Sequence, residues 1–153
     1  PDALLEHTYS SASIQNMWLN GRKAGEIGID AAVVGQMGIP TVMVSGDDKA
    51  CAEAEDWIPG VVSCQVKVGL ACQGARLLSR EKAHELIAQK TAEAIGKIGS
   101  IRPVRVDTPV TLRVEKVERQ GIPNAWAREE IRRIDARTYE ITADTVEQAL
   151  SRT

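Results

Sequence analysis

Two carboxylates four residues apart are the first candidates for chemistry in this sequence. Glu26 and Asp30 lie in the segment 25–35, GEIGIDAAVVG, whose apolar spacing indicates a helix. Glu26 shares the apolar stripe of that helix, and a buried carboxylate costs several kcal/mol unless a cation, a metal ion or backbone donors accompany it. We therefore predict such a partner for Glu26, although favourable interaction with the helix N-terminus explains its position equally well. Asp30 is left open between a surface or capping residue and one that supports a metal ligand from behind.

His7 is the second candidate, because histidine serves as a metal ligand, nucleophile or proton carrier near neutral pH. It lies in the polar segment HTYSS, which is suited to form the edge of a substrate site. A structural or simply exposed histidine is the alternative. The other histidine, His84, lies between charged residues of a predicted helix, and we expect it to be solvated.

Asp47 and Lys67 are weaker candidates for substrate binding. Asp47 follows a predicted buried strand, and open α/β sheets place their ligands at the carboxyl ends of strands. Capping of the next helix explains Asp47 as well. Lys67 lies near the end of another predicted strand, where it is able to bind a substrate carboxylate or remain solvated.

Composition excludes several classes of function. The 153 residues are 43% hydrophobic and 26% charged, with a formal net charge of −2, which gives no reason to expect a nucleic acid or a membrane as partner. No P-loop, GxGxxG, GxSxG or HExxH pattern occurs. The three cysteines lack CxxC spacing, so we expect free thiols. The first residues do not resemble a signal peptide, which favours a cytoplasmic protein.

Alternating strands and helices must position these residues. We predict strands over 13–19, 39–45, 61–68, 110–118 and 135–143, and helices over 25–38, 49–57, 79–99, 121–133 and 144–153. Asn20-Gly21 is a strong turn signal after the first strand. The order predicts an α/β fold with a mostly parallel sheet flanked by helices, followed by a small α+β subdomain of β-α-β-α order. We place the first unit at 1–100 and the second at 101–153.

A family resemblance sharpens these expectations. The sequence has a His, then NGRKAGEIG, a strand ending in GDD, a helix followed by IP, and VK ahead of an LSREKA helix start. In this combination it resembles the carboxy-terminal half of the D-aminopeptidases encoded with bacterial dipeptide permeases, a zinc metallopeptidase family. The resemblance covers about the first hundred residues well and the rest more loosely.

The resemblance implies a two-metal site that activates water for amide hydrolysis, with two zinc ions per subunit in the intact enzyme. Glu26 matches the family's metal ligand in the GE-[IL]-G motif, and His7 matches its catalytic histidine. The implied substrates are short D-amino-acid peptides resembling D-Ala-D-Ala. A homo-oligomer is also implied, because family members form rings.

The family's remaining ligands come from an Asp-x-Glu, an Asp-Ser-His and a Gly-x-His motif, none of which occurs in this sequence. One carboxylate and one histidine cannot hold two zinc ions. Since the chain starts at Pro1 without a methionine, we expect an amino-terminal part to lie outside it and to complete the site. The resulting prediction is a zinc aminopeptidase active only with that part, and the alternative is a non-catalytic α/β regulatory or interaction domain.

Overall fold

The structure, a computed structural model, describes residues 3–124, 126 and 128–153. Its strands are β1 (Ile14–Leu19), β2 (Arg22–Ala24), β3 (Met43–Gly46), β4 (Val62–Gln65), β5 (Lys67–Ala71), β6 (Gly74–Leu77), β7 (Val110–Lys116), β8 (Ile131–Arg133) and β9 (Thr138–Ala143). Its helices are α1 (Glu26–Gln36), α2 (Asp48–Trp57), α3 (Arg80–Gly96) and α4 (Val146–Leu150).

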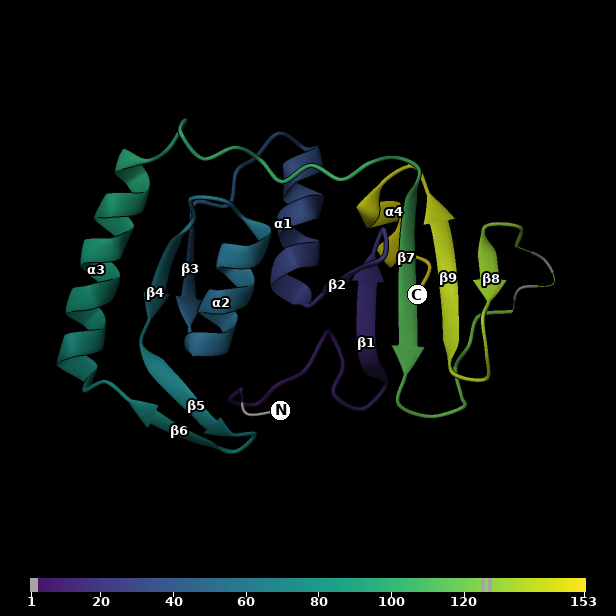
Figure 1. Cartoon of the computed structure of the whole chain (residues 1–153), viewed down its shortest axis with the longest axis horizontal. Helices are drawn as coiled ribbons and strands as arrows, with labels where there is room; N and C mark the ends of the chain where they lie inside the picture. Colours follow the sequence, from purple (N-terminus) through teal and green to yellow (C-terminus); the bar gives the residue numbers. More distant parts are fainter. Residues whose placement is uncertain (1–2, 125, 127) are drawn as a thin grey trace.

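The main sheet has five strands in the order β2-β1-β7-β9-β8, and every neighbouring pair is antiparallel (Figure 1). Alternate residues of β1 and β7 point into the core, so Met17, Leu19, Leu112 and Val114 are buried while the residues between them face outward. The helix α4 packs against β7 and β9 and also contacts α1. One face of the sheet therefore carries the apolar core.

The predicted fold class, with a mostly parallel sheet, is wrong. Among the described residues, parallel pairing is found only between β3 and β4, and β5 and β6 form a separate antiparallel hairpin. Of the strands that follow residue 100, β7 pairs directly with β1, and β9 and β8 extend the same sheet instead of forming a separate small layer. The order of strands and helices along the chain misled the prediction, because it carries no signal for the long-range pairing of β1 with β7.

Local signals predicted several elements correctly. Asn20 and Gly21 both adopt positive φ, +48° and +80°, as a two-residue turn between β1 and β2 requires. Asp47 caps α2, and α3 and α4 lie within the predicted helical ranges. Side chains that accept a hydrogen bond from the first turn thus fix where the helices begin.

Two local predictions fail. The strand predicted over 61–68 is divided into β4 and β5, and the hairpin partner β6 was not predicted. The helix predicted over 121–133 is also wrong: Ile131–Arg133 form β8, paired with β9, and residues 125 and 127 lie outside the described part of the chain. Pairing along the sheet edge overrides the local helical pattern there.

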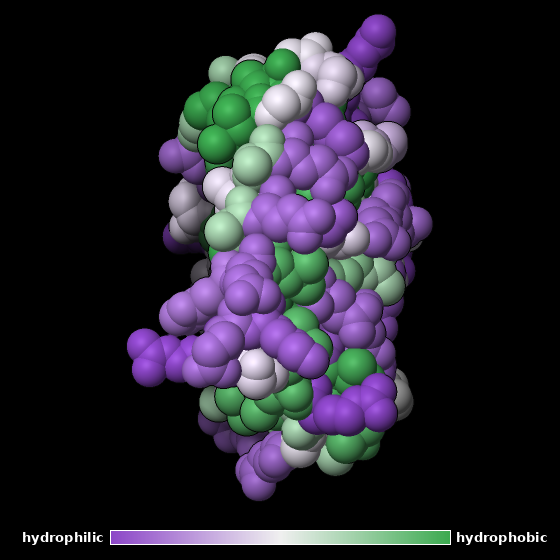
Figure 2. Space-filling model, turned by 90° about the vertical axis from the view of Figure 1, so that its left-hand side faces the viewer, coloured by the Kyte–Doolittle hydropathy of each residue, from purple (hydrophilic) through white to green (hydrophobic). Residues whose placement is uncertain are grey.

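The surface beside α3 carries apolar side chains. Figure 2 shows this side of the molecule, with hydrophobic areas toward its upper and lower ends and mostly hydrophilic side chains between them. Ile95, near the end of α3, and Ile98, just beyond it, are 62% and 63% exposed. Leu70 and Leu77 of the β5–β6 hairpin are 63% and 68% exposed. None of the described helices is both long and apolar enough to span a bilayer.

Candidate functional site

His7 and Glu26 meet at the start of α1. Glu26 is the first residue of the helix, and its carboxylate Oε2 lies 3.4 Å from Nε2 of His7. Both side chains are partly open to solvent. Two residues 19 positions apart in the sequence are thus brought together.

A hydrogen bond to the backbone orients the His7 ring and determines which nitrogen atom faces Glu26. Nδ1 of His7 lies 2.7 Å from the carbonyl oxygen of Leu5. A carbonyl only accepts, so Nδ1 carries the hydrogen and, in the neutral ring, Nε2 presents a lone pair to the Glu26 carboxylate. Without a proton on Nε2 or a metal ion nearby, this lone pair and the carboxylate oxygen repel each other. The pair therefore fits a site that holds a cation.

Asp30 has a distinct role one helical turn further on. The hydroxyl of Tyr9 donates a hydrogen bond of 2.5 Å to Oδ1 of Asp30. Burial, this bond, and the charges of Asp30 and Glu26 all raise the pKa of Tyr9, which keeps the phenol neutral. His7 thus contacts Glu26, and Tyr9 contacts Asp30 one helical turn further along. The segment that contains His7 and Tyr9 therefore runs along α1.

The same segment is anchored at its beginning. The backbone N–H of Leu4 donates to Oδ2 of Asp47 at 2.9 Å, and that of Leu5 donates to the carbonyl of Cys72 at 2.6 Å. Asp47 is 4% exposed, and its Oδ1 accepts from Ala50 N–H at 2.8 Å. Desolvation raises the pKa of Asp47, but the hydrogen bonds from backbone N–H groups outweigh it and hold that pKa below its ordinary value.

Asp47 and Lys67 lie away from the cavity beside His7, as far as the described residues define its walls. Both carboxylate oxygens of Asp47 accept hydrogen bonds from backbone N–H groups. Lys67 is the first residue of β5 and lies opposite Leu77 of β6. Their predicted roles in substrate binding stay predictions. His84 is exposed on α3.

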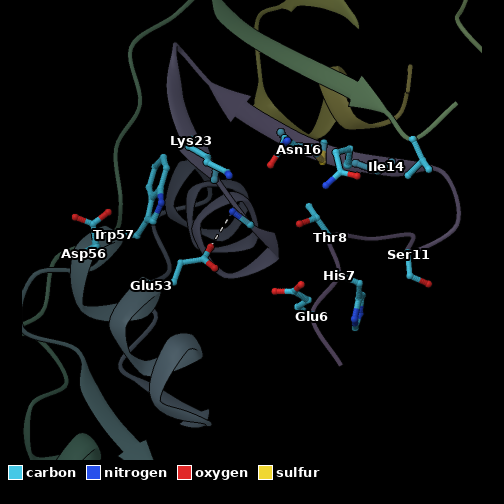
Figure 3. A pocket seen from close by; sticks show the side chains of 15 residues that line it. Glu6, His7, Thr8, Ser11, Ile14, Asn16, Lys23, Glu53, Asp56 and Trp57 are labelled. Carbon is cyan, nitrogen blue, oxygen red and sulfur yellow. Dashed lines mark hydrogen bonds between the residues drawn. The ribbon is translucent and has the colours of Figure 1, made fainter. Parts of the chain in front are cut away.

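A cavity of about 720 Å³ opens beside His7 (Figure 3). Its walls include the segment around His7, the outward-facing Asn16 of β1, Lys23 of β2, and Glu53 and Trp57 of α2. The volume falls within the range of small-molecule sites, and the polar side chains suit a peptide backbone.

Glu53 connects this cavity to α1. Its Oε1 accepts hydrogen bonds from the backbone N–H of Gly25 at 2.9 Å, which Figure 3 marks, and of Gly28 at 3.1 Å. Gly25 itself has no side chain with which to cap the helix, so a carboxylate from α2 replaces the missing cap. This fixes the end of α1 that carries Glu26.

The donors fit one part of a zinc site and not a whole one. Within residues 3–124, 126 and 128–153, no three His, Cys, Asp or Glu side chains are close enough to share a metal ion. Glu26 supplies a carboxylate and His7 an imidazole, whereas zinc requires at least three protein ligands. Further ligands are needed to complete such a site.

Sequence reasoning did not single out Glu53, Trp57 or the role of Tyr9. Glu53 and Trp57 are four residues apart on α2, a spacing that predicts a shared helix face. Nothing in the sequence, however, indicates that this face meets the start of α1. Tyr9 was noted only as part of a polar segment.

Comparison with known proteins gives consistent matches. The sequence model of the M55 peptidase family, described as D-aminopeptidase, matches residues 1–153. A D-aminopeptidase of Bacillus subtilis (strain 168) is 37% identical over 98 residues, which make up 63% of this chain and 36% of that protein.

The fold matches a solved structure described as "Zn-dependent D-aminopeptidase DppA from Bacillus subtilis, a self-compartmentalizing protease", with a TM-score of 0.90 and 26% sequence identity. The match covers 99% of this chain and 55% of that one. The chain thus spans about half the length of the structure it resembles.

Proposed function

The chain belongs to the M55 family of D-aminopeptidases, and we propose on that premise that it forms part of a zinc-dependent aminopeptidase acting on short D-amino-acid peptides. The observation that carries the proposal is the placement of His7 Nε2 opposite Glu26 Oε2, 3.4 Å apart, at the first residue of α1. Such a pair favours a proton or a metal ion beside it, and metal-assisted hydrolysis uses both a metal ion and a proton that is transferred.

Glu26 is the proposed zinc ligand of this chain. Two features support it: the carboxylate lies at the surface of the molecule next to an imidazole, and α1 is fixed behind it by Glu53. Zinc, when bound, polarises a carbonyl group and lowers the pKa of a bound water.

His7 is the proposed proton carrier. The Leu5 carbonyl holds Nδ1, so Nε2 is the atom that takes up and releases the proton, and the Glu26 carboxylate stabilises the protonated ring. A proton held there is available to the amine that leaves when the peptide bond breaks. The cavity beside His7 gives the peptide access to that atom.

The remaining zinc ligands are proposed to lie outside these 153 residues. The incomplete donor set supports this, as does the fact that the chain spans 55% of the zinc-dependent relative. For the intact protein we propose two zinc ions per subunit, a homo-oligomeric assembly, a cytoplasmic location and D-Ala-D-Ala-like substrates.

Metal analysis of the intact protein tests the role of Glu26. We expect Glu26→Ala to lower the zinc content, while Glu81→Ala leaves it unchanged. Glu81 is a matched control because it too is an acidic residue in the first turn of a helix. Equal zinc content in both variants, with a similar small loss of stability, identifies Glu26 as a helix-dipole partner and favours the non-catalytic alternative.

The rate of peptide hydrolysis tests His7. We expect His7→Ala to retain its zinc but to lose about 10²- to 10⁴-fold in kcat, the usual contribution of a general acid or base. His84→Ala, which removes an exposed histidine from α3, is the control and should hydrolyse D-Ala-D-Ala at the unchanged rate. A fully active His7→Ala protein contradicts the proposed role.

A further inference from the structure

We propose that a second cavity, lined by Arg22, Arg102 and Arg105 and called here the arginine cavity, binds a small dianion whose oxygens belong to a phosphate group or to two carboxylate groups. Its volume is about 480 Å³, which is sufficient for a small ligand. Trp57 lines both this cavity and the one beside His7. The arginine cavity therefore lies next to the candidate active site and is distinct from it.

Arg22 is held in place from two sides. Its guanidinium carbon lies 3.9 Å from the centre of the Trp57 ring, and Nη2 donates to the carbonyl and carboxylate oxygens of Asp56 at 2.7 and 2.8 Å. Stacking on an indole and a fixed carboxylate orient the planar guanidinium. Both bonds come from Nη2, so Nε and Nη1 have no acceptor among the described residues.

Arg102 and Arg105 come from the connector between α3 and β7. They are three residues apart in a segment without helix or strand and line the same cavity. The connector passes over the carboxyl end of α1 (Figure 1), so close that a Cβ on Gly35 would lie 2.1 Å from the Val104 carbonyl oxygen. Ile101, at its start, is buried. The backbone that carries both arginines is therefore fixed by packing.

The charges of the cavity are unbalanced. Arg102 and Arg105 make no ion pair or hydrogen bond through their side chains within the part of the chain that the structure describes, and no carboxylate lines this cavity there. Arginine stays protonated at all ordinary pH values. Arg22 is paired with Asp56, so the uncompensated charges are those of Arg102 and Arg105. Their guanidinium groups repel each other, and an anion placed between them removes that repulsion.

The geometry of the side chains indicates the class of ligand. The two parallel N–H donors of a guanidinium group match the paired oxygens of a phosphate or carboxylate group. The ammonium group of a lysine is a point charge and lacks this match. Ser100 adds a hydroxyl to the lining, and Pro59 and Pro103 add apolar surface. A small dianion with a compact body fits this lining.

Binding of inorganic phosphate and of succinate to the intact, metal-loaded protein tests the proposal. Isothermal titration should show binding of at least one of them, weakened at least tenfold in the Arg102→Gln/Arg105→Gln variant. The control is Arg76→Gln/Arg119→Gln, which removes two exposed arginines that have no partner among the described residues and do not line the cavity. Its affinity should remain within twofold of that of the unchanged protein.

Each result is decisive. Preference for phosphate assigns the ligand to phosphorylated compounds, and preference for succinate assigns it to dicarboxylates. The proposal is overturned if neither anion binds, if the Arg102→Gln/Arg105→Gln variant binds as tightly as the unchanged protein, or if the control loses as much affinity as that variant. Zinc content is measured in every variant. An anion that still binds the Arg102→Gln/Arg105→Gln variant at unchanged affinity and zinc content is bound at the metal and not in the arginine cavity.

Discussion

Gly25 and Gly28 are explained by two side chains of α2. A Cβ on Gly25 would lie 2.6 Å from Oε2 of Glu53, and a Cβ on Gly28 would lie 2.6 Å from the Trp57 ring. At Gly28 the neighbour is a buried ring, so glycine permits an approach that a Cβ would block. At Gly25 the neighbour is the end of a flexible side chain, which a Cβ would turn away from the N–H groups that it accepts from. At these two glycines the backbone at the start of α1 packs closely against α2. Glu26 lies between them in the sequence, and its side chain points toward His7. The spacing Gly-Glu-x-Gly thus combines a packing requirement with a functional residue.

We expect Gly28→Ala to lower the free energy of unfolding by about 1–3 kcal/mol, because the added methyl group collides with a buried ring. Alanine favours the helix by about 1 kcal/mol over glycine, so the steric cost must exceed that gain. Urea denaturation measures the difference.

The matched control is Gly96→Ala at the end of α3, where a Cβ would meet nothing within 4 Å. It should be neutral or stabilising. A Gly28→Ala protein as stable as the Gly96→Ala protein contradicts the close packing of Trp57 on α1.

The candidate site was partly predictable at the scale of single residues. Type and pattern drew attention to His7 and Glu26, and the structure places them 3.4 Å apart. Asp30 remained ambiguous because helix periodicity alone does not indicate which tyrosine or backbone group lies opposite. Glu53 could not be found, because its partners are backbone N–H groups of another helix.

At the scale of elements, Asp47 joins the start of α2 to the segment that carries His7. One carboxylate oxygen caps the helix at Ala50, and the other accepts from Leu4. The capping half was predictable, because the sequence around a helix start shows it. The contact with Leu4 spans 43 residues and leaves no local signal.

Asp47 should also make stability depend on pH. Burial opposes its charge, but bonds from Ala50, Leu4 and Lys49 N–H groups dominate and hold its pKa in the folded protein below the ordinary value of 3.8. For a carboxyl group whose pKa is lowered by folding, the stabilisation is complete above the unfolded pKa and is lost as the pH falls through the folded pKa.

We therefore expect Asp47→Asn to cost about 1 kcal/mol of unfolding free energy near neutral pH, and the difference from the unchanged protein to shrink below about pH 4. Urea denaturation at several pH values measures it. Asp107→Asn is the control, because that exposed carboxylate has no partner in the described structure, and it should show no such trend. A difference for Asp47→Asn that grows at acidic pH contradicts the assignment.

Secondary structure and sheet topology differed in how far the sequence predicted them. The prediction of α1, α2 and α3 succeeded, because α1 has apolar spacing and α2 and α3 begin after the capping side chains of Asp47 and Ser79. The sheet required β7 to pair with β1, for example Val114 with Met17, which are far apart in the sequence. Alternating apolar residues showed that each strand has one buried face, but they do not specify the neighbouring strand.

At the scale of the whole molecule, the connector between α3 and β7 joins the region of β3 and β4 to the five-stranded sheet. It passes over α1, the helix that carries Glu26, and it carries Arg102 and Arg105 of the arginine cavity. The connector thus adds to the contacts that α1 makes with α2 on one side and with α4 on the other (Figure 1). Gly35 is the residue on which it depends.

We expect Gly35→Ala to lower the free energy of unfolding by about 3 kcal/mol, because the new methyl group would lie 2.1 Å from the Val104 carbonyl oxygen and a backbone atom cannot turn aside as a side chain does. The connector must then lift away from α1, so hydrogen exchange should become faster around residues 101–106. Binding of phosphate or succinate in the arginine cavity should weaken at the same time. Gly96→Ala again serves as the control for a helical glycine without a neighbour. If Gly35→Ala leaves both stability and exchange at the level of that control, the connector does not hold the two regions together, and the arginines it carries are not fixed in place.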